Sequence, residues 1–457
     1  MLFNSFAFLL AFLPAALLAH GLVERFRPGW RLPLLVGLSF LFYGWWDPRF
    51  VPLLAASILL NWLVAEAFAR TARRVLIPLA IAGNLLVLAL FKYLDFLSGL
   101  LAVLPGWAAP RFDLALPLGI SFFTFHHVMY LTDLGRGRAP RFDLVRYTLY
   151  IAFFPQVLAG PLVRWTEIMH QLDERPYLRP DAAERFARGL MLLAAGLAKK
   201  VFLGDPLAEI VNPVFEAAAA GQMVTGAQAW GATLGFAFQI YFDFSGYTDM
   251  ALGLALLFGV VLPQNFDAPY RAASLQDFWR RWHMTLSRFL RDYLYVPLGG
   301  SRRGLPVQLW ALVATMGLGG LWHGAGLTFV AWGLAHGLGL CAGVLWRRSG
   351  LPMPTVLGWA LTFLFVALTW VLFRATSFEA AMRIYEGLLG FQPWGGGFKW
   401  RTLAPAALVA LLGPTAWAFV HRLPPRRWVA AGFAAVLVAV LFKIGDDANY
   451  EFIYFQF

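Results

Sequence analysis

Charged residues are scarce in this chain of 457 amino acids. Asp, Glu, Lys and Arg together make up 14% of it, whereas soluble domains carry about 25% charged residues. So few charges cannot cover a water-facing surface, which excludes an ordinary soluble protein. Hydrophobic residues reach 60% and the mean hydropathy is +0.64, so the composition favours a surface that faces lipid.

Cysteine and the short motifs of several enzyme classes are also missing. Cys341 is the only cysteine, so an intrachain disulfide and a cysteine-ligated metal site are excluded. The chain has neither the G-x-S-x-G elbow of serine hydrolases nor a phosphate-binding P-loop. His-x-x-x-His and Glu-x-x-His spacings do not accompany His283 or His323, so we expect no metal site, although folding could bring His323 and His336 together.

Long apolar stretches run through the chain, and a membrane-spanning helix needs about 20 mostly apolar residues. The stretches are Leu2–Val23, Leu34–Trp46, Val51–Phe68, Val75–Phe91, Leu114–Leu131, Tyr147–Val163, Gly189–Leu203, Gly226–Val261, Val307–Leu321, Leu327–Leu345, Val356–Phe373, Leu403–Val420 and Val429–Phe442. Several are too short to span alone, so we expect roughly 10–12 spans and some re-entrant segments. The first stretch lacks a preceding basic region and a small-residue cleavage site, which predicts a retained helix.

The net charge of +12 comes from 37 Lys and Arg against 25 Asp and Glu. The basic residues gather between the apolar stretches, at Arg25, Arg27, Arg31, Arg70, Arg73, Arg74, Arg136, Arg138, Arg141, Arg146, Arg347, Arg348, Arg422, Arg426 and Arg427. Cytoplasmic loops of membrane proteins carry such an excess of Lys and Arg. We therefore expect the charge to set membrane orientation and to meet lipids, with no nucleic-acid partner.

The segment from Gln264 to Arg303 interrupts the series of apolar stretches. Ser274 followed by Asp277 is a capping signature that predicts a helix start. Apolar residues then recur at helical spacing on one side, at Leu275, Trp279, Trp282, Leu286, Phe289 and Tyr293, and arginines gather on the other, at Arg280, Arg281, Arg288 and Arg291. The pattern predicts one amphipathic helix, ended by Pro297 and Gly299–Gly300, that lies at the membrane interface or lines a cavity inside the protein.

Two of the eight histidines have a context that suggests chemistry. His323 lies in GLGGLWHGAG, where flanking glycines permit a close approach of backbone to ligand, and Trp322 precedes it. His283 follows Trp282 on the apolar side of the expected helix. A neutral imidazole in a site of low dielectric is a suitable general base. For His126 and His127, on an apolar stretch, packing with a hydrogen bond is the simpler interpretation.

Long motifs in chain order resemble the membrane-bound O-acyltransferase family, in its bacterial alginate and peptidoglycan O-acetylation branch. They are MLFNSFAFLLAFLP at the start, LPLGISFFTF at 116–125, FFPQVLAGPLVR at 153–164, YFDFSGYTDMALGL at 241–254, FWRRWHMTLSRFLRDYLYVPLGG at 278–300 and GGLWHGAG at 319–326. The resemblance implies an all-α polytopic membrane helical bundle, with re-entrant and interfacial helices around a central tunnel. It also implies transfer of an acyl group from a thioester to a hydroxyl.

In that resemblance the near-invariant histidine of the family corresponds to His323, and a second characteristic histidine to His283. His323 would act as the base, and His283, a Trp nitrogen or a backbone N–H would stabilise the oxyanion. Trp279, Trp282 and Trp322 would bind substrate. For Arg280 and Arg281 two roles stay open, attraction of a phosphate-bearing donor and contact with lipid headgroups.

Polar residues also interrupt the apolar stretch Gly226–Val261, at Asp243, Ser245, Tyr247 and Asp249. Such groups are costly within a membrane unless they are paired. We expect them to face the tunnel or neighbouring helices, more as structural supports and substrate contacts than as catalysts.

The last residues, ANYEFIYFQF, could be an aromatic anchor at the membrane interface. The ending also resembles an F-x-Y-F-x-F motif of some acyl-export systems, in which the central tyrosine, here Tyr454, is a candidate acyl carrier. A phenol ionises near a pKa of about 10, so its ester keeps more transfer potential than a sugar ester. We therefore divide the chain into a membrane domain, 1–445, and an aromatic tail, 446–457.

The expected function is a membrane O-acetyltransferase of the bacterial inner membrane. Acetyl-CoA would be the cytoplasmic donor substrate, with no resident cofactor, and an extracytoplasmic SGNH-type protein would be the partner that acetylates a polysaccharide. Polytopic composition alone would equally suit a transporter or channel, and an inactive scaffold is a third alternative. The retention of His283 and His323 argues against the scaffold.

Overall fold

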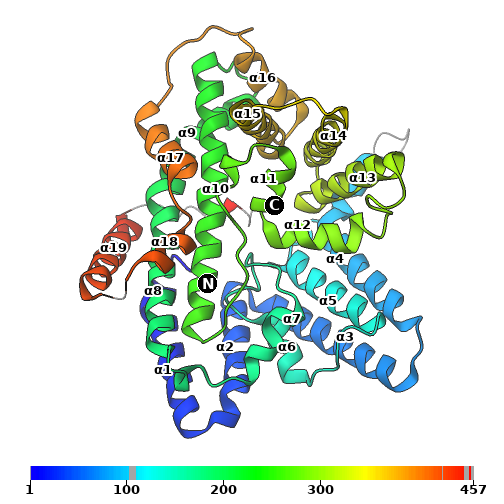
Figure 1. Cartoon of the computed structure of the whole chain (residues 1–457), viewed down its shortest axis with the longest axis vertical. Coiled ribbons are helices and arrows are strands. Elements are labelled where there is room, and N and C mark those ends of the chain that lie inside the picture. The colour runs from blue at the N-terminus through cyan, green and yellow to red at the C-terminus, as the bar shows by residue number, and fades with distance from the viewer. Residues whose placement is uncertain (1, 102–109, 425, 447–451, 454–457) are drawn as a thin grey trace. The chain divides into compact units, whose positions relative to one another are not determined.

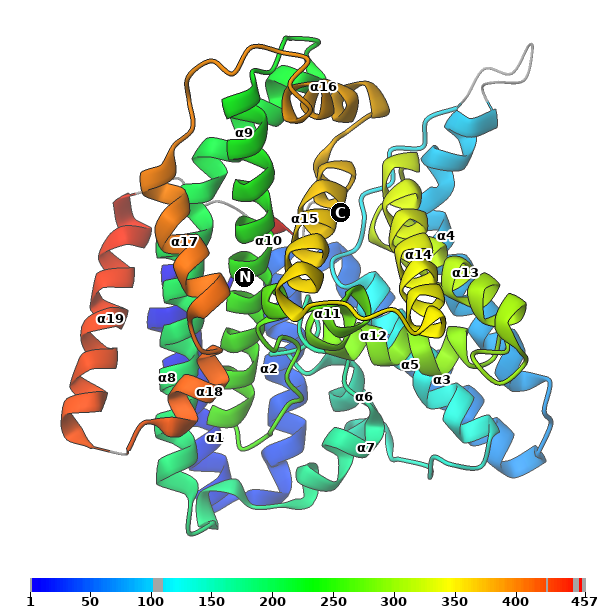
Figure 2. The same cartoon turned by 45° about the horizontal axis from the view of Figure 1, so that its top comes forward.

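The computed structural model describes residues 2–101, 110–424, 426–446 and 452–453 of the chain. Throughout these residues the regular structure is helical, as Figures 1 and 2 show. The prediction of an all-α fold is confirmed. The predicted boundary between residues 445 and 446 stays a prediction, because most of the tail lies outside the described residues.

Contacts divide the chain into two compact units. The first comprises Met1–Ala195, Tyr247–Pro263 and Leu423–Ala448, and the second comprises Gly196–Gly246, Gln264–Arg422 and Asn449–Phe457. Helices α8 (Ala182–Ala198) and α10 (Gly226–Leu257) begin in one unit and end in the other. Each unit is therefore built from segments that are distant in the sequence.

The first unit is built around aromatic side chains. Its other helices are α1 (Leu13–Phe26), α2 (Arg31–Trp46), α3 (Val51–Thr71), α4 (Leu76–Leu101), α5 (Ile120–Gly135), α6 (Leu144–Ala152), α7 (Trp165–Ile168) and α19 (Arg427–Asp446). Phe42 lies at the centre of a cluster, with ring centroids 5.8 Å from Phe8 and 5.4 Å from Phe154. Such tilted and edge-on pairs add to the stabilisation that burial of the rings provides.

The second unit carries the basic segment and the residues around His323. Its helices are α9 (Asp205–Ala219), α11 (Leu275–Arg281), α12 (Met284–Leu290), α13 (Leu305–His323), α14 (Leu327–Ser349), α15 (Thr355–Arg374), α16 (Phe378–Leu388), α17 (Trp400–Leu412) and α18 (Ala416–Arg422). Three fully buried tryptophans, Trp282, Trp332 and Trp370, lie in its core. The ring centroid of Trp370, in α15, is 5.1 Å from that of Trp282 and 5.5 Å from that of Trp332. Helix α15 therefore packs against both α14 and the residue that follows α11.

Seven helices among the described residues are long and apolar enough to cross a membrane, or eight if the bent pair α17 and α18 is one span. Large apolar side chains remain exposed along them, for example Leu60 of α3 and Leu86 of α4, as expected for helices that face lipid. The chain is therefore a multi-pass membrane protein. This number is lower than the predicted 10–12 spans, because some apolar stretches form short helices, such as the nine-residue α6, followed by turns.

Candidate active site

The basic segment forms two short helices, so the prediction of one continuous helix is wrong. The predicted start is confirmed, because the Ser274 hydroxyl accepts a hydrogen bond from the Asp277 N–H at 3.2 Å. Helix α11 ends at Arg281, and His283 adopts a left-handed backbone conformation with φ of +41°. A non-glycine residue with positive φ is strained and needs support from its surroundings.

Asn265 supplies this support. Its backbone carbonyl accepts the Met284 N–H at 2.9 Å, and its Oδ1 accepts the Thr285 N–H at 3.2 Å and the Thr285 hydroxyl at 2.9 Å. The first two N–H donors of the new helix α12 are thus satisfied by one residue from outside it, one through its backbone carbonyl and one through its side chain. The sequence signal for this break is weak, because neither glycine nor proline marks the position of His283.

The same amide determines which nitrogen of His283 carries a proton. The Thr285 N–H can only donate, so the Asn265 oxygen must face it, and His283 Nδ1, 3.0 Å from that oxygen, must donate as well. The lone pair of the neutral ring therefore lies on Nε2. Burial lowers the pKa of His283 from 6.5 to about 3, so the ring is neutral at physiological pH. Neutral His283 can accept a hydrogen bond through Nε2.

His323 lies at the C-terminal end of α13, surrounded by aromatic rings. Its ring centroid is 4.7 Å from that of Trp322, 5.2 Å from that of Trp332 and 5.2 Å from that of Phe373. Trp322 also lies 6.4 Å from the ring of His283. The structure thus brings both predicted histidines against the same indole, although they come from different helices.

Two glycines near His323, Gly320 and Gly324, serve helix packing, which corrects for these two the prediction that they open the backbone to a ligand. A Cβ on Gly320 would lie 2.3 Å from the Phe329 carbonyl oxygen, and one on Gly333 would lie 2.3 Å from the Met316 oxygen. A Cβ on Gly324 would lie 2.2 Å from the Phe329 ring. Glycine is required here because α13 and α14 pack backbone against backbone.

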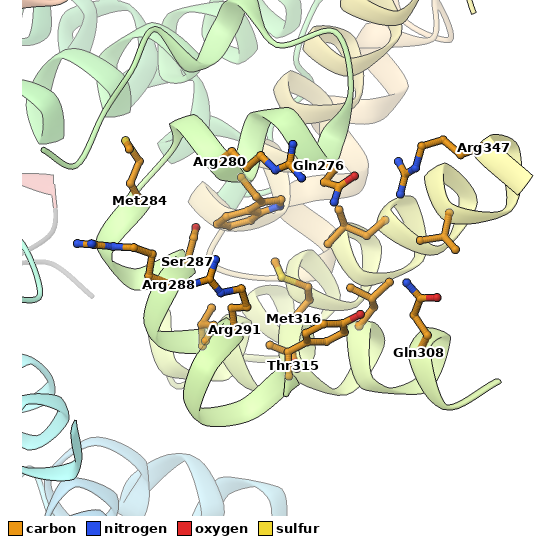
Figure 3. Close-up of a pocket in the computed structure, with 16 residues that line it drawn as sticks. Gln276, Arg280, Met284, Ser287, Arg288, Arg291, Gln308, Thr315, Met316 and Arg347 are labelled. Atoms are coloured by element: carbon orange, nitrogen blue, oxygen red, sulfur yellow. The ribbon is translucent and has the colours of Figure 1, made fainter. Parts of the chain in front are cut away.

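A cavity of about 430 Å³ opens beside the break, between α11, α12, α13 and α14 (Figure 3). Its polar and aromatic lining consists of Gln276, Trp279, Arg280, Ser287, Arg288, Arg291, Tyr295, Gln308, Thr315 and Arg347. Figure 3 shows Arg288 on one side and Arg347 on the other. Among the described residues, four arginines and no acidic residue line the cavity, although Arg291 pairs with the neighbouring Asp292 at 2.7 Å. The lining suits an anionic ligand.

The predicted substrate-binding residues of this segment separate into two groups. Trp279 and Arg280 line the cavity. Arg281 instead pairs with Asp277 at 3.0 Å, within its own helix. Trp282 is buried in the core, stacked on Phe278 with centroids 5.6 Å apart.

His336 supports the cavity wall, a role that the sequence did not reveal. The Trp279 indole N–H donates to His336 Nδ1 at 3.2 Å, so Nε2 carries the ring proton and donates to the Thr369 hydroxyl at 3.0 Å. That hydroxyl donates to the Val366 carbonyl at 3.0 Å. This chain of bonds fixes the indole of Trp279. No group of acidic, His and Cys residues in the described part of the chain could hold a metal ion.

The polar residues of α10 have different partners. Asp243 forms an ion pair with Lys200 at 2.7 Å, and Ser245 lies 3.5 Å from the ammonium of Lys199. Tyr247 stacks on Phe3 in the first unit, with centroids 5.0 Å apart, and Asp249 is buried in that same unit. Tyr454, the predicted acyl carrier, lies outside the described residues.

Comparison with known proteins identifies the family. Residues 85–382 match the model of the membrane-bound O-acyltransferase family. The peptidoglycan O-acetyltransferase of Helicobacter pylori is 36% identical over 427 residues, which cover 85% of this chain and 80% of that protein. The probable alginate O-acetylase AlgI of Pseudomonas aeruginosa is 39% identical over 410 residues, 86% and 76% of the two chains.

A more distant relative acts on another substrate. The teichoic acid D-alanyltransferase of Bacillus subtilis is 27% identical over 319 residues, 66% of this chain and 78% of that protein. The family match includes both site histidines, the Asn265 contact and the cavity. The helical membrane fold and these matches lead to one conclusion: the chain belongs to the membrane-bound O-acyltransferase family and is an acyltransferase.

Proposed function

We propose that the protein takes acetyl from acetyl-CoA and passes it across the bacterial inner membrane for O-acetylation of an extracytoplasmic polysaccharide. The names of the peptidoglycan and alginate relatives support the acetyl group and this class of acceptor. The observation that carries the proposal is the site itself, in which two buried histidines contact one indole in the unit that holds a cavity lined by arginines.

The cavity fits a phosphate-bearing donor. Coenzyme A carries a diphosphate and a ribose phosphate, and guanidinium groups bind phosphate oxygens through pairs of N–H donors. Arg280 and Arg347 come from helices on different sides of the cavity, α11 and α14. The indole of Trp279, fixed by His336, supplies a flat apolar part of the lining. Lipid headgroups carry phosphate groups as well. A competition assay distinguishes acetyl-CoA from such lipids, because only acetyl-CoA carries the thioester.

The chemistry is acyl transfer from sulfur to oxygen. His323 removes the proton of the acceptor hydroxyl, whose oxygen attacks the thioester carbon. The C–O bond forms, the C–S bond breaks, and the thiolate of coenzyme A takes up the proton. General base catalysis of this kind contributes about 10²–10⁴ to the rate.

The protonation of His283 favours a role different from the expected oxyanion donor. Its Nδ1–H donates to Asn265, so the remaining nitrogen accepts and does not donate. We assign His283 the task of accepting a hydrogen bond from the acceptor hydroxyl or from His323. The indole N–H of Trp322, which lies against both histidines, is the better candidate to stabilise the oxyanion.

In the proposed relay, the first acceptor is the phenol of Tyr454. Its oxygen forms an aryl ester with acetyl as the thioester breaks. A serine hydroxyl of the SGNH-type partner then attacks that ester and returns the proton to the phenol. The partner finally passes the acetyl group to the polysaccharide.

Substitution of Tyr454 in cells tests this relay. Tyr454→Phe, which removes only the hydroxyl, should abolish acetylation of the polymer while the protein level stays at that of wild type. Polymer acetylation at the wild-type level would overturn the relay. The alternative function is that of a transporter or channel. It predicts that even the purified wild-type protein does not cleave the thioester.

A further inference from the structure

A buried charged cluster lies where α8 gives way to α9. Lys200 is 2% exposed and lies in a π-helix, Lys199–Gly204. Its ammonium is 2.7 Å from Asp205 Oδ1 and 2.7 Å from Asp243 Oδ1. Single π-helical turns often mark functional positions. Two carboxylates face one ammonium, so the cluster bears one negative charge more than the lysine balances, and further donors stabilise it.

Close packing of two chain segments creates this cluster. A Cβ on Gly246 would lie 2.9 Å from the Gly196 carbonyl oxygen and 3.3 Å from Lys199 Cβ. Gly246 follows Asp243 by one helical turn, so this close approach brings the carboxylate of α10 to the π-helix. The cluster is thus part of the second unit and does not depend on the other unit.

Phe452 and Ile453, close to the C-terminal end of the sequence, complete the cluster. The Ile453 N–H donates to Asp243 Oδ2 at 2.7 Å, so that both oxygens of this carboxylate are engaged. The ammonium of Lys200 lies 4.8 Å from the centroid of the Phe452 ring, in a cation–π contact. Phe452 and Ile453 are 1% and 5% exposed. The cluster therefore binds this segment through one backbone amide and one aromatic ring.

We propose that Lys200, Asp205 and Asp243 form a docking site that positions the C-terminal segment for acyl transfer. This inference rests on the proposed function, since Tyr454 directly follows Ile453 in the chain. Asp243 binds a backbone N–H, which every residue except proline has. Lys200 favours an aromatic ring at position 452. The three residues are positioning residues, and none of them takes part in the bond-forming step.

Hydrogen exchange of the full-length protein in detergent, without a donor, tests the docking site. The amide of Ile453 should exchange slowly in wild type and at least about tenfold faster in two variants. Asp243→Asn removes the charge of the acceptor, and Lys200→Met removes the cation–π partner of Phe452 and leaves two buried carboxylates without their counter-ion. Phe452→Leu, which keeps the buried partners of the ion pair, should accelerate exchange by a smaller factor. Lys199→Met, a change of the neighbouring lysine, is the matched control and should leave this amide slow.

Two results would overturn the docking site. One is slow exchange of Ile453 in both Lys200→Met and Phe452→Leu. The other is an acceleration that α8 and α10 share in every variant, which would make the cluster only a packing element. Failure of the proposed function gives a different pattern, with normal protection of Ile453 but no acetyl transfer to the protein.

Discussion

Two buried histidines of the first unit, His126 and His127, are held differently from two of the second unit, His283 and His323. In the first unit, His126 contacts the Phe122 carbonyl at 2.9 Å and accepts the Val163 N–H at 3.2 Å. His127 contacts the Tyr147 hydroxyl at 2.8 Å and the Ser57 hydroxyl at 3.1 Å. All four ring nitrogens therefore hold the fold together.

The pair in the second unit is positioned by backbone strain and aromatic rings. The strained conformation of His283 and the amide of Asn265 direct one imidazole, whereas indole and phenyl rings enclose His323. Burial is equal in the two pairs, since His126, His127 and His283 are each 0% exposed and His323 is 5% exposed. The comparison teaches that burial alone does not distinguish the two pairs, whereas the groups that hold each imidazole do.

Loss of His323 should show the largest difference in activity between the two pairs. His323→Ala should lower polymer acetylation in cells by about 10²–10⁴, because the general base is lost, at an unchanged level of membrane protein. The control is His126→Ala, which should lower the amount of folded protein and leave the activity per folded molecule near that of wild type. Equal activity per molecule in the two variants would remove the distinction.

Asn265→Ala should have the next largest effect. Without this amide the proton of His283 is no longer held on Nδ1, and acetyl transfer by purified protein should fall by about 10². Thr285→Val is the matched control, because it removes one hydroxyl donor to the same oxygen and keeps the backbone N–H. A loss as large in the valine variant would assign Asn265 to helix packing alone.

Arg280→Ala should raise KM for acetyl-CoA about tenfold with kcat little changed, since a charged contact to phosphate is lost. Arg281→Ala should change KM much less, because that guanidinium pairs with Asp277 outside the cavity lining. Steady-state kinetics of the two variants measure the difference. Equal KM values would place the donor elsewhere.

The smallest effect on activity is expected from His127. In His127→Phe the hydroxyls of Tyr147 and Ser57 lose their buried partner, which should cost about 1–3 kcal/mol of stability. Thermal unfolding in detergent should show a lower Tm, with acetyl transfer per folded molecule unchanged. A loss of transfer without a change in Tm would give the first pair a chemical role.

Much of the fold could be predicted from the sequence, because composition and apolar stretch length reflect the solvent directly. The helix start at Ser274 was also predictable, since the cap is local. The break at His283 was not, because the residue that stabilises it, Asn265, is 18 positions away. Lys200 was overlooked for the same reason, since its two carboxylates and Phe452 come from three separate segments.

The candidate site was predictable only as residue types. The family motifs pointed to His283 and His323, but the tautomer of His283 depends on a contact that spacing does not show. The glycines around His323 suggested an opening, whereas Gly320 allows α13 and α14 to touch. A glycine in a helix has the same sequence signature in both cases, and only the neighbouring helix distinguishes them.

Transfer of radiolabelled acetyl from acetyl-CoA to the purified protein tests the central claim most directly. Wild type and His336→Gln should retain covalent label, with weaker donor binding in the latter, and His323→Ala should retain none. Label on His323→Ala at the wild-type level would contradict the assignment of His323 as the base for acyl transfer.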